Sequence, residues 1–246
     1  MIKTEHLSKR YGTLVAVDDI SFEVHPGEVL GFLGPNGAGK TTTMRVLAGF
    51  IAPTSGRASI FGHDVEADPI AAKSCVGYLP EGAPAYGEMS ALGFLEFIAD
   101  LRGLRGAMRR TRLSTVIERL ALGPVLQQPI ETLSKGFRRR VGLAQAIVHD
   151  PAVLILDEPT DGLDPNQKHE VRTLIGEMSR DKIIVISTHI LEEVDAVCTR
   201  AVIIARGRLV VDDTPAGLAA RSPSGRLDDV FRNLTQEPAP QPAPAT

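Results

Sequence analysis

Short β-like runs alternate with helical stretches along most of the chain. The runs that predict strands are IKTEHL, SFEV, EVLGFL, ASIFG, CVGYLP, AVLILD, KIIVIS, AVIIA and RLVVD. The segments VLILD and IIVIS are continuously apolar, which is typical of strands buried on both faces of a parallel sheet. The pattern therefore predicts an α/β fold with a mostly parallel sheet.

Three segments depart from this alternation. Residues 2–33 hold several strand-like runs and no convincing helix, which predicts an antiparallel β element before the main sheet. Residues 84–148 are mostly helical with Gly and Pro punctuation, and we interpret them as a helical subdomain inserted into the core. Residues 236–246, QEPAPQPAPAT, predict a disordered tail, so we expect one domain over residues 1–235.

Composition narrows the class of protein. The 246 residues are 43% hydrophobic and 23% charged, and the net charge of −3 argues against nucleic acid as a partner. No apolar run approaches the roughly 20 residues that cross a bilayer, and MIKTEHLSKR has no apolar signal core. We therefore expect a cytosolic protein that does not itself span a membrane. Cys75 and Cys198 lack metal or redox spacing, so we interpret them as buried reduced thiols.

The sequence GPNGAGKT, residues 34–41, fits the spacing G-x-x-x-x-G-K-[ST] between a strand and a helical stretch. Glycines there let the backbone approach phosphate oxygens, and N–H groups at the helix start add partial positive charge. Lys40 adds a full charge near the β- and γ-phosphates, and Thr41 can bind Mg²⁺. The alternative, a chance lysine in a glycine-rich turn, does not explain the flanking strand and helix. We expect nucleotide to bind at Gly34, Pro35, Asn36, Gly37, Ala38, Gly39, Lys40, Thr41 and Thr42.

Two carboxylates follow the apolar run VLIL. Asp157, at the tip of a buried strand beside a phosphate loop, is an expected Mg²⁺ partner, and Glu158 can orient and deprotonate an attacking water. After IIVI come Ser187, Thr188 and His189, and we interpret His189 as a polar group that contacts the γ-phosphate. The alternatives are an acidic strand end, a structural histidine, or a kinase that directs a substrate hydroxyl to Glu158.

Together these segments resemble an ATP-binding cassette ATPase, the nucleotide-binding subunit of an ABC transporter, over about residues 1–220. GPNGAGKT resembles the Walker A motif, VLILDEPT the Walker B motif and ISTH the switch-histidine motif. GLDP resembles the D-loop and includes Asp164, and KRYG places Tyr11 where the family stacks an aromatic ring on adenine. The resemblance implies a P-loop NTPase fold with an inserted helical subdomain, and ATP and Mg²⁺ as ligands.

LSKGF, residues 133–137, resembles the family's LSGGQ signature, which begins a helix and contacts the γ-phosphate of ATP held by the other subunit. Ser134 is a good helix N-cap, and Gly136 permits close approach of the backbone. Lys135 replaces the first glycine and Phe137 the glutamine. Because Lys135 adds positive charge beside an anion, we expect phosphate binding at Ser134, Lys135 and Gly136 to survive.

The helix expected after this signature carries an apolar stripe at Phe137, Val141, Ala144 and Val148. Residues 138–140, all arginine, start off that stripe. We interpret them as a solvated face or as charges at a subunit contact, and not as a nucleic-acid patch, because the chain has no basic excess.

In VGYLPEG, Glu81 stands where the family usually has a glutamine that bridges Mg²⁺, the attacking water and the membrane subunit. A carboxylate can bind Mg²⁺ but cannot donate a hydrogen bond when it is ionised. We therefore expect Glu81 to be a metal ligand with altered metal dependence or coupling.

The resemblance extends to a subgroup of exporters whose membrane subunit is a separate polypeptide, through LSKGF, VGYLPEG and LDDVF. It implies that two copies bind two ATP molecules head to tail and move an integral membrane permease from the cytoplasmic face of the membrane. The alternatives are a soluble ABC-class ATPase, such as one for cluster assembly, and a nucleotide-binding module without hydrolysis.

Overall fold

The computed structural model describes residues 1–235, so the tail expected at residues 236–246 lies outside the described part. Its centre is a six-stranded sheet in the order β10-β9-β3-β8-β7-β6, in which only β10 runs antiparallel to its neighbour. This confirms the predicted mostly parallel sheet. The strands are β3 (Val29–Leu33), β6 (Val76–Leu79), β7 (Val153–Asp157), β8 (Ile183–Thr188), β9 (Arg200–Ala205) and β10 (Arg208–Asp213).

A second sheet of four strands is antiparallel throughout, in the order β2-β1-β4-β5. Its strands are β1 (Ile2–Tyr11), β2 (Leu14–Val24), β4 (Ser55–Ile60) and β5 (His63–Asp64). The expected antiparallel element at the N-terminus is therefore present, but its extent differs from residues 2–33. The run at Val29–Leu33 belongs to the parallel sheet, and two strands from beyond the phosphate loop complete the antiparallel one.

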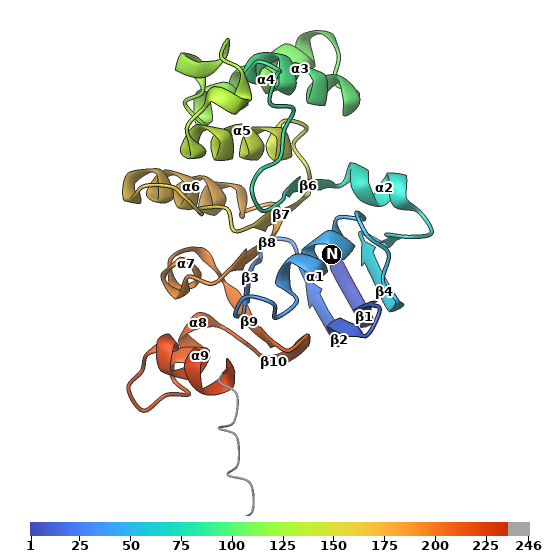
Figure 1. The fold of residues 1–246 in the computed structure, drawn as a ribbon, viewed down its shortest axis with the longest axis vertical. Coiled ribbons are helices and arrows are strands. Elements are labelled where there is room, and N and C mark those ends of the chain that lie inside the picture. Colours follow the sequence, from blue (N-terminus) through green and yellow to red (C-terminus); the bar gives the residue numbers. More distant parts are fainter. Residues whose placement is uncertain (236–246) are drawn as a thin grey trace, which may run out of the picture.

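The helices surround these sheets. The stretch expected to be helical holds α3 (Ala91–Leu101), α4 (Gly106–Arg119) and α5 (Lys135–Ile147), which gather at one end of the molecule (Figure 1). The remaining helices are α1 (Lys40–Leu47), α2 (Pro69–Ser74), α6 (Pro165–Met178), α7 (Leu191–Val197), α8 (Pro215–Ala219) and α9 (Leu227–Thr235). Among residues 1–235, no helix is long and apolar enough to cross a membrane.

The parallel sheet separates two hydrophobic cores. Alternate residues of β7 face opposite sides, with Leu154 and Leu156 in the core that includes α3 to α6. Val153 and Ile155 belong to the other core, which includes α1 and the antiparallel sheet. Because all four side chains are completely buried, the continuously apolar run is explained by burial on both faces. A third cluster joins α7, α8 and α9 to β9.

Candidate nucleotide site

The loop between β3 and α1 is held by both sheets. Gly207, in the turn between β9 and β10, accepts from Asp18 N at 2.8 Å and donates to the Ala38 carbonyl at 3.0 Å. A Cβ at Gly39, where φ is 107°, would lie 2.3 Å from the carbonyl oxygen of Ala16. Only glycine fits such a close approach, so the backbone path of the loop requires glycine at position 39.

Lys40 begins helix α1 and is largely buried. Its ammonium group donates to the carbonyl oxygens of Gly34 at 2.7 Å and Pro35 at 3.2 Å. Burial lowers the pKa of Lys40, while the carboxylates of Glu158, Asp157 and Glu81 oppose that shift. These carboxylates therefore favour the charged lysine that phosphate binding requires.

Asp157 ends strand β7 next to the start of α1. The Thr41 hydroxyl lies 3.4 Å from Asp157 Oδ1, and the Ser187 hydroxyl donates to the same oxygen. The second oxygen, Oδ2, is buried and has no hydrogen-bond partner among the described residues. A buried carboxylate oxygen with no partner is costly, so this geometry fits a bound cation.

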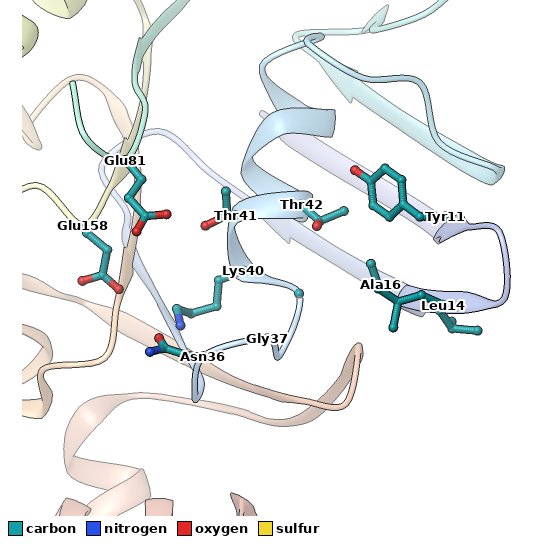
Figure 2. A pocket seen from close by; sticks show the side chains of 12 residues that line it. Tyr11, Leu14, Ala16, Asn36, Gly37, Lys40, Thr41, Thr42, Glu81 and Glu158 are labelled. Atoms are coloured by element: carbon teal, nitrogen blue, oxygen red, sulfur yellow. The ribbon is translucent and has the colours of Figure 1, made fainter. Parts of the chain in front are cut away.

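The oxygen donors at this position fit Mg²⁺. Residues 1–235 contain no cluster of three or more His, Cys, Asp or Glu side chains that would hold a metal without help. Mg²⁺ usually binds one or two carboxylates together with substrate phosphates, and Thr41 and Asp157 supply that partial set. Glu81 is the third oxygen donor expected from the sequence, and it faces the same cleft (Figure 2).

Glu158 contacts His189 directly. The Nδ1 atom of His189 lies 3.0 Å from both carboxylate oxygens of Glu158. The Glu158 side chain is only 12% exposed, whereas that of His189 is 53% exposed. The two groups therefore form a pair in which a partly buried carboxylate is oriented by an accessible imidazole.

A cleft of about 420 Å³ joins these elements. Tyr11, Leu14 and Ala16 lie at one end, Glu81 and Glu158 at the other, and the loop with Lys40 lies between them (Figure 2). The expected nucleotide residues that line it are Tyr11, Asn36, Gly37, Gly39, Lys40, Thr41 and Thr42. Gly34, Pro35 and Ala38 shape the loop but do not line the cleft.

Signature residues Ser134, Lys135 and Gly136 do not line this cleft. Ser134 caps α5 as expected, since its hydroxyl accepts from Phe137 N at 3.3 Å. Lys135 instead pairs with Asp161 of its own chain at 3.0 Å. Asp164 caps helix α6 by accepting from Gln167 N at 2.9 Å. The structure thus brings the Walker residues together and leaves the signature on a separate surface.

The prediction for residues 138–140 is wrong for two of the three arginines. Arg138 is exposed, but Arg139 is only 5% exposed, and Arg140 pairs with Glu170 at 2.8 Å from a mostly buried position. The apolar stripe is confirmed, since Val141, Ala144 and Val148 are completely buried and Phe137 is partly buried against the same core. The helical periodicity placed Arg139 on an exposed face. It did not show that Arg139 binds backbone carbonyls of segments far away in the sequence.

The structure also adds residues that sequence reasoning missed. Leu14, Val15 and Ala16 line the cleft beside Tyr11 because β1 and β2 form a hairpin whose turn lies there. Gly12 could have indicated this turn from the sequence, because glycine is common in turns. In the structure Gly12 has a positive φ of 59°. Ser187 binds Asp157, and its carbonyl accepts from Glu158 N at 3.0 Å.

Comparisons with known proteins agree with this geometry. Residues 17–161 match the family model described as ABC transporter. Probable multidrug ABC transporter ATP-binding protein YbhF of Escherichia coli K12 is 34% identical over 230 residues, which are 93% of this chain and 40% of that protein. Nod factor export ATP-binding protein I of Paraburkholderia xenovorans is 36% identical over 231 residues, 94% of this chain and 76% of that protein.

A solved structure described as an ATP binding subunit of an ABC transporter has the same fold. It superimposes with a TM-score of 0.88 at 29% identity, covering 96% of this chain and 100% of the other. The chain spans less than half of the length of YbhF, so that relative includes further parts. The matched family model, these relatives and the shared fold together show that the chain belongs to the ABC transporter family.

Proposed function

We propose that this chain is the ATP-binding and ATP-hydrolysing subunit of an ABC transporter that acts as an exporter. The observation that carries the proposal is the Glu158–His189 pair at one end of the cleft that contains the phosphate loop. A nucleotide-binding module without hydrolysis has no need of an oriented carboxylate beside the phosphates.

The proposed reaction is attack of water on the γ-phosphorus of ATP. Glu158 accepts the proton from the water, and His189 holds the Glu158 carboxylate in place. The bond from the γ-phosphorus to its bridging oxygen breaks, which gives ADP and phosphate. Lys40 and the loop N–H groups hold the phosphates. Thr41, Asp157 and Glu81 would hold Mg²⁺, which would neutralise negative charge on the phosphates.

The position of the signature supports a dimer. Because Ser134 and Gly136 do not line the cleft of their own chain, we infer that they contact ATP bound to a second copy. ATP would then link the phosphate loop of one copy to the N-terminus of α5 in the other. Hydrolysis removes the γ-phosphate and with it that link, so the dimer opens.

A groove of about 610 Å³ supports docking of a separate membrane subunit. It is lined by Ala85, Tyr86, Gly87, Glu88, Met89, Phe97 and Glu131. The first five of these follow shortly after Glu81 in the sequence. Tyr86 is 61% exposed and Phe97 42% exposed, and their rings lie side by side with centroids 5.9 Å apart. Two adjacent exposed rings fit a surface that a partner covers. The proposed site of action is the cytoplasmic face of a membrane, and the relative named for Nod factor export supports the direction of transport.

The test uses Glu158→Gln, which removes the base but keeps the shape of the side chain. The wild-type chain should release phosphate from Mg-ATP, and the variant should be slower by about a hundredfold or more. Light scattering on the variant should show a monomer that becomes a dimer when Mg-ATP is added. Adding Ser134→Arg to the variant should abolish the dimer while ATP still binds to the monomer.

Two outcomes would contradict the proposal. Wild-type protein that binds ATP but releases no phosphate, alone or with its membrane subunit, would reject hydrolysis. A dimer that forms equally well with Ser134→Arg would reject the role of the signature at the second nucleotide.

A further inference from the structure

Arg139 is a buried cation whose hydrogen bonds go to backbone carbonyls. Its guanidinium donates to Asp157 O at 2.8 Å, to Pro159 O at 3.3 Å and also to the carbonyl of Glu158. A fourth bond reaches Pro80 O at 3.2 Å. All four acceptors within the described residues are backbone carbonyls, so the guanidinium group holds backbone.

The backbone that Arg139 holds is strained. Glu158 has a φ of 52°, in the left-handed region that residues other than glycine rarely adopt. Such a conformation costs about 1–3 kcal/mol and persists only where the surroundings impose it. Ser187 holds one side of Glu158 by accepting from its N–H at 3.0 Å. Arg139 holds the other side through three successive carbonyls, from residues 157 to 159.

The hydrogen bond to Pro80 also fixes the segment that carries a second carboxylate, Glu81. Pro80 directly precedes Glu81, which lines the cleft opposite Lys40 (Figure 2). One turn beyond Arg139, a Cβ at Gly142 would lie 2.7 Å from the Cβ of Ala83, so α5 packs closely on the Glu81 loop. Both carboxylate-bearing segments are therefore tied to one helix.

That helix begins at the signature. Ser134 caps α5, and Arg139 lies little more than one turn further along the same helix. On the function proposed above, the N-terminus of α5 contacts ATP in the second copy, while Arg139 contacts the segments that place Glu158 and Glu81 at ATP in its own copy. A shift of α5 when the dimer closes would therefore change the position of Glu158.

We propose that Arg139 is a positioning residue that makes the placement of Glu158 and Glu81 depend on the signature helix. It does not line the nucleotide cleft. It links the helix that contacts one ATP to the general base that acts on the other, and this inference rests on the proposed function.

The test compares Arg139→Gln and Arg139→Lys with Arg138→Gln, which removes an exposed charge from the same helix. ATP binding to the monomer should stay within about twofold of wild type in all three variants, because the loop and Lys40 are unchanged. The value of kcat should fall by about tenfold to a hundredfold in both Arg139 variants with little change in KM, since small displacements of a catalytic group have effects of that size. Arg138→Gln should match wild type.

Chemical rescue separates positioning from a general loss of structure. In Arg139→Ala, guanidinium at concentrations far below those that unfold proteins should restore part of kcat by occupying the vacated site. It should not raise kcat in Arg138→Ala. If Arg139→Gln does not fold, Arg139→Lys provides the same comparison, because it keeps the charge and the stem but cannot reach all four carbonyls.

Two results would overturn this role. One is a folded Arg139→Lys or Arg139→Gln variant with kcat within twofold of wild type. The other is a loss of ATP binding to the monomer that accounts for the whole loss of turnover. Failure of the proposed function would give a different result, because wild type and Arg138→Gln would then also release no phosphate.

Discussion

At the scale of single residues, the charge balance around Lys40 distinguishes this site. Burial lowers the pKa of Lys40, and Glu158, Asp157 and Glu81 oppose the shift. In related ATPases the position of Glu81 usually carries a neutral glutamine, as the resemblance implies. The extra carboxylate therefore places one more negative charge near the phosphates than the usual arrangement does.

Glu81→Gln should change how ATP binding depends on Mg²⁺. Without Mg²⁺, the variant should bind ATP more tightly than wild type by roughly threefold to tenfold, because one repulsive charge is gone. With saturating Mg²⁺ the difference should shrink, since the cation offsets that charge. Titrations of a fluorescent ATP analogue with and without Mg²⁺ measure both values.

Equal affinities without Mg²⁺ would show that the Glu81 charge does not act on the phosphates. Glu88→Gln is a matched control, because Glu88 lines the neighbouring groove and not the nucleotide cleft.

Residues of the site were predictable from sequence where the signal is contiguous. The loop at residues 34–42 reads directly, because its spacing and its flanking elements are local. Arg139 was not predictable, because its acceptors are distant in sequence. Three of them lie 18 to 20 residues further along, from the end of β7 onward, and Pro80 lies 59 residues before it. In the sequence Arg139 stands between two other arginines and looks like an exposed charge. Only the packing of α5 against two other segments shows that it is buried.

At the scale of elements, helix α7 ties together the two loops that carry Glu158 and His189. Glu193 on α7 is only 2% exposed and accepts hydrogen bonds from Thr160 and from Thr188, the latter at 2.6 Å. Thr160 lies two residues after Glu158, and Thr188 directly precedes His189. Burial raises the pKa of Glu193, and its bond from Thr188 opposes the shift. One buried carboxyl group therefore sets the spacing of the pair.

Replacing Glu193 should show whether this buried carboxyl group stabilises the fold and the Glu158–His189 contact. Glu193→Ala should lower the free energy of unfolding by about 2 kcal/mol or more, because two buried hydroxyls lose their acceptor. It should also lower kcat, because the Glu158–His189 contact loosens. Glu193→Gln keeps an acceptor and a donor, so its stability should stay within about 1 kcal/mol of wild type.

Urea unfolding and steady-state turnover provide both measurements. Glu192→Ala, at an exposed position next to Glu193, is the control that should leave both unchanged. A Glu193→Ala protein as stable and as active as the control would show that α7 does not set the spacing.

At the scale of the whole molecule, the C-terminal helices close one side of the fold. Leu218 on α8 and Leu227 on α9 are buried against Ile203 of β9 and Val194 of α7. Helices α8 and α9 lie at the opposite end of the molecule from α3 and α4 (Figure 1). This cluster is part of the domain and covers the side of the sheet near β9.

Two truncations should define the end of the domain. A chain ending at Thr235 should keep the stability and ATP affinity of the full chain, because we expect the last eleven residues to add nothing to the core. A chain ending at Asp213 should lose several kcal/mol, at about 1.5–3 kcal/mol for each large apolar side chain removed. Urea unfolding of the three proteins provides the comparison, and a loss in the Thr235 chain would place the boundary later.

The strand runs predicted from the sequence all correspond to strands, because burial on one or both faces leaves a local apolar pattern. Sheet membership was harder to predict. Val29–Leu33 and Ser55–Ile60 both looked like strands, yet one joins the parallel sheet and the other the antiparallel sheet. That choice is made by pairing between segments far apart in sequence, which periodicity does not record.

The clamp on the phosphate loop has a thermodynamic consequence. Gly207 and Ala16 fix the loop from two sheets, so its backbone is already preorganised for phosphate. Arriving ATP therefore loses little free energy to the entropy of ordering the loop, a cost of about 1–2 kcal/mol for each residue that is fixed. On the function proposed above, the favourable free energy that remains is available to join two copies of the chain. A rigid loop in the monomer would thus make the nucleotide more effective at joining the proposed dimer.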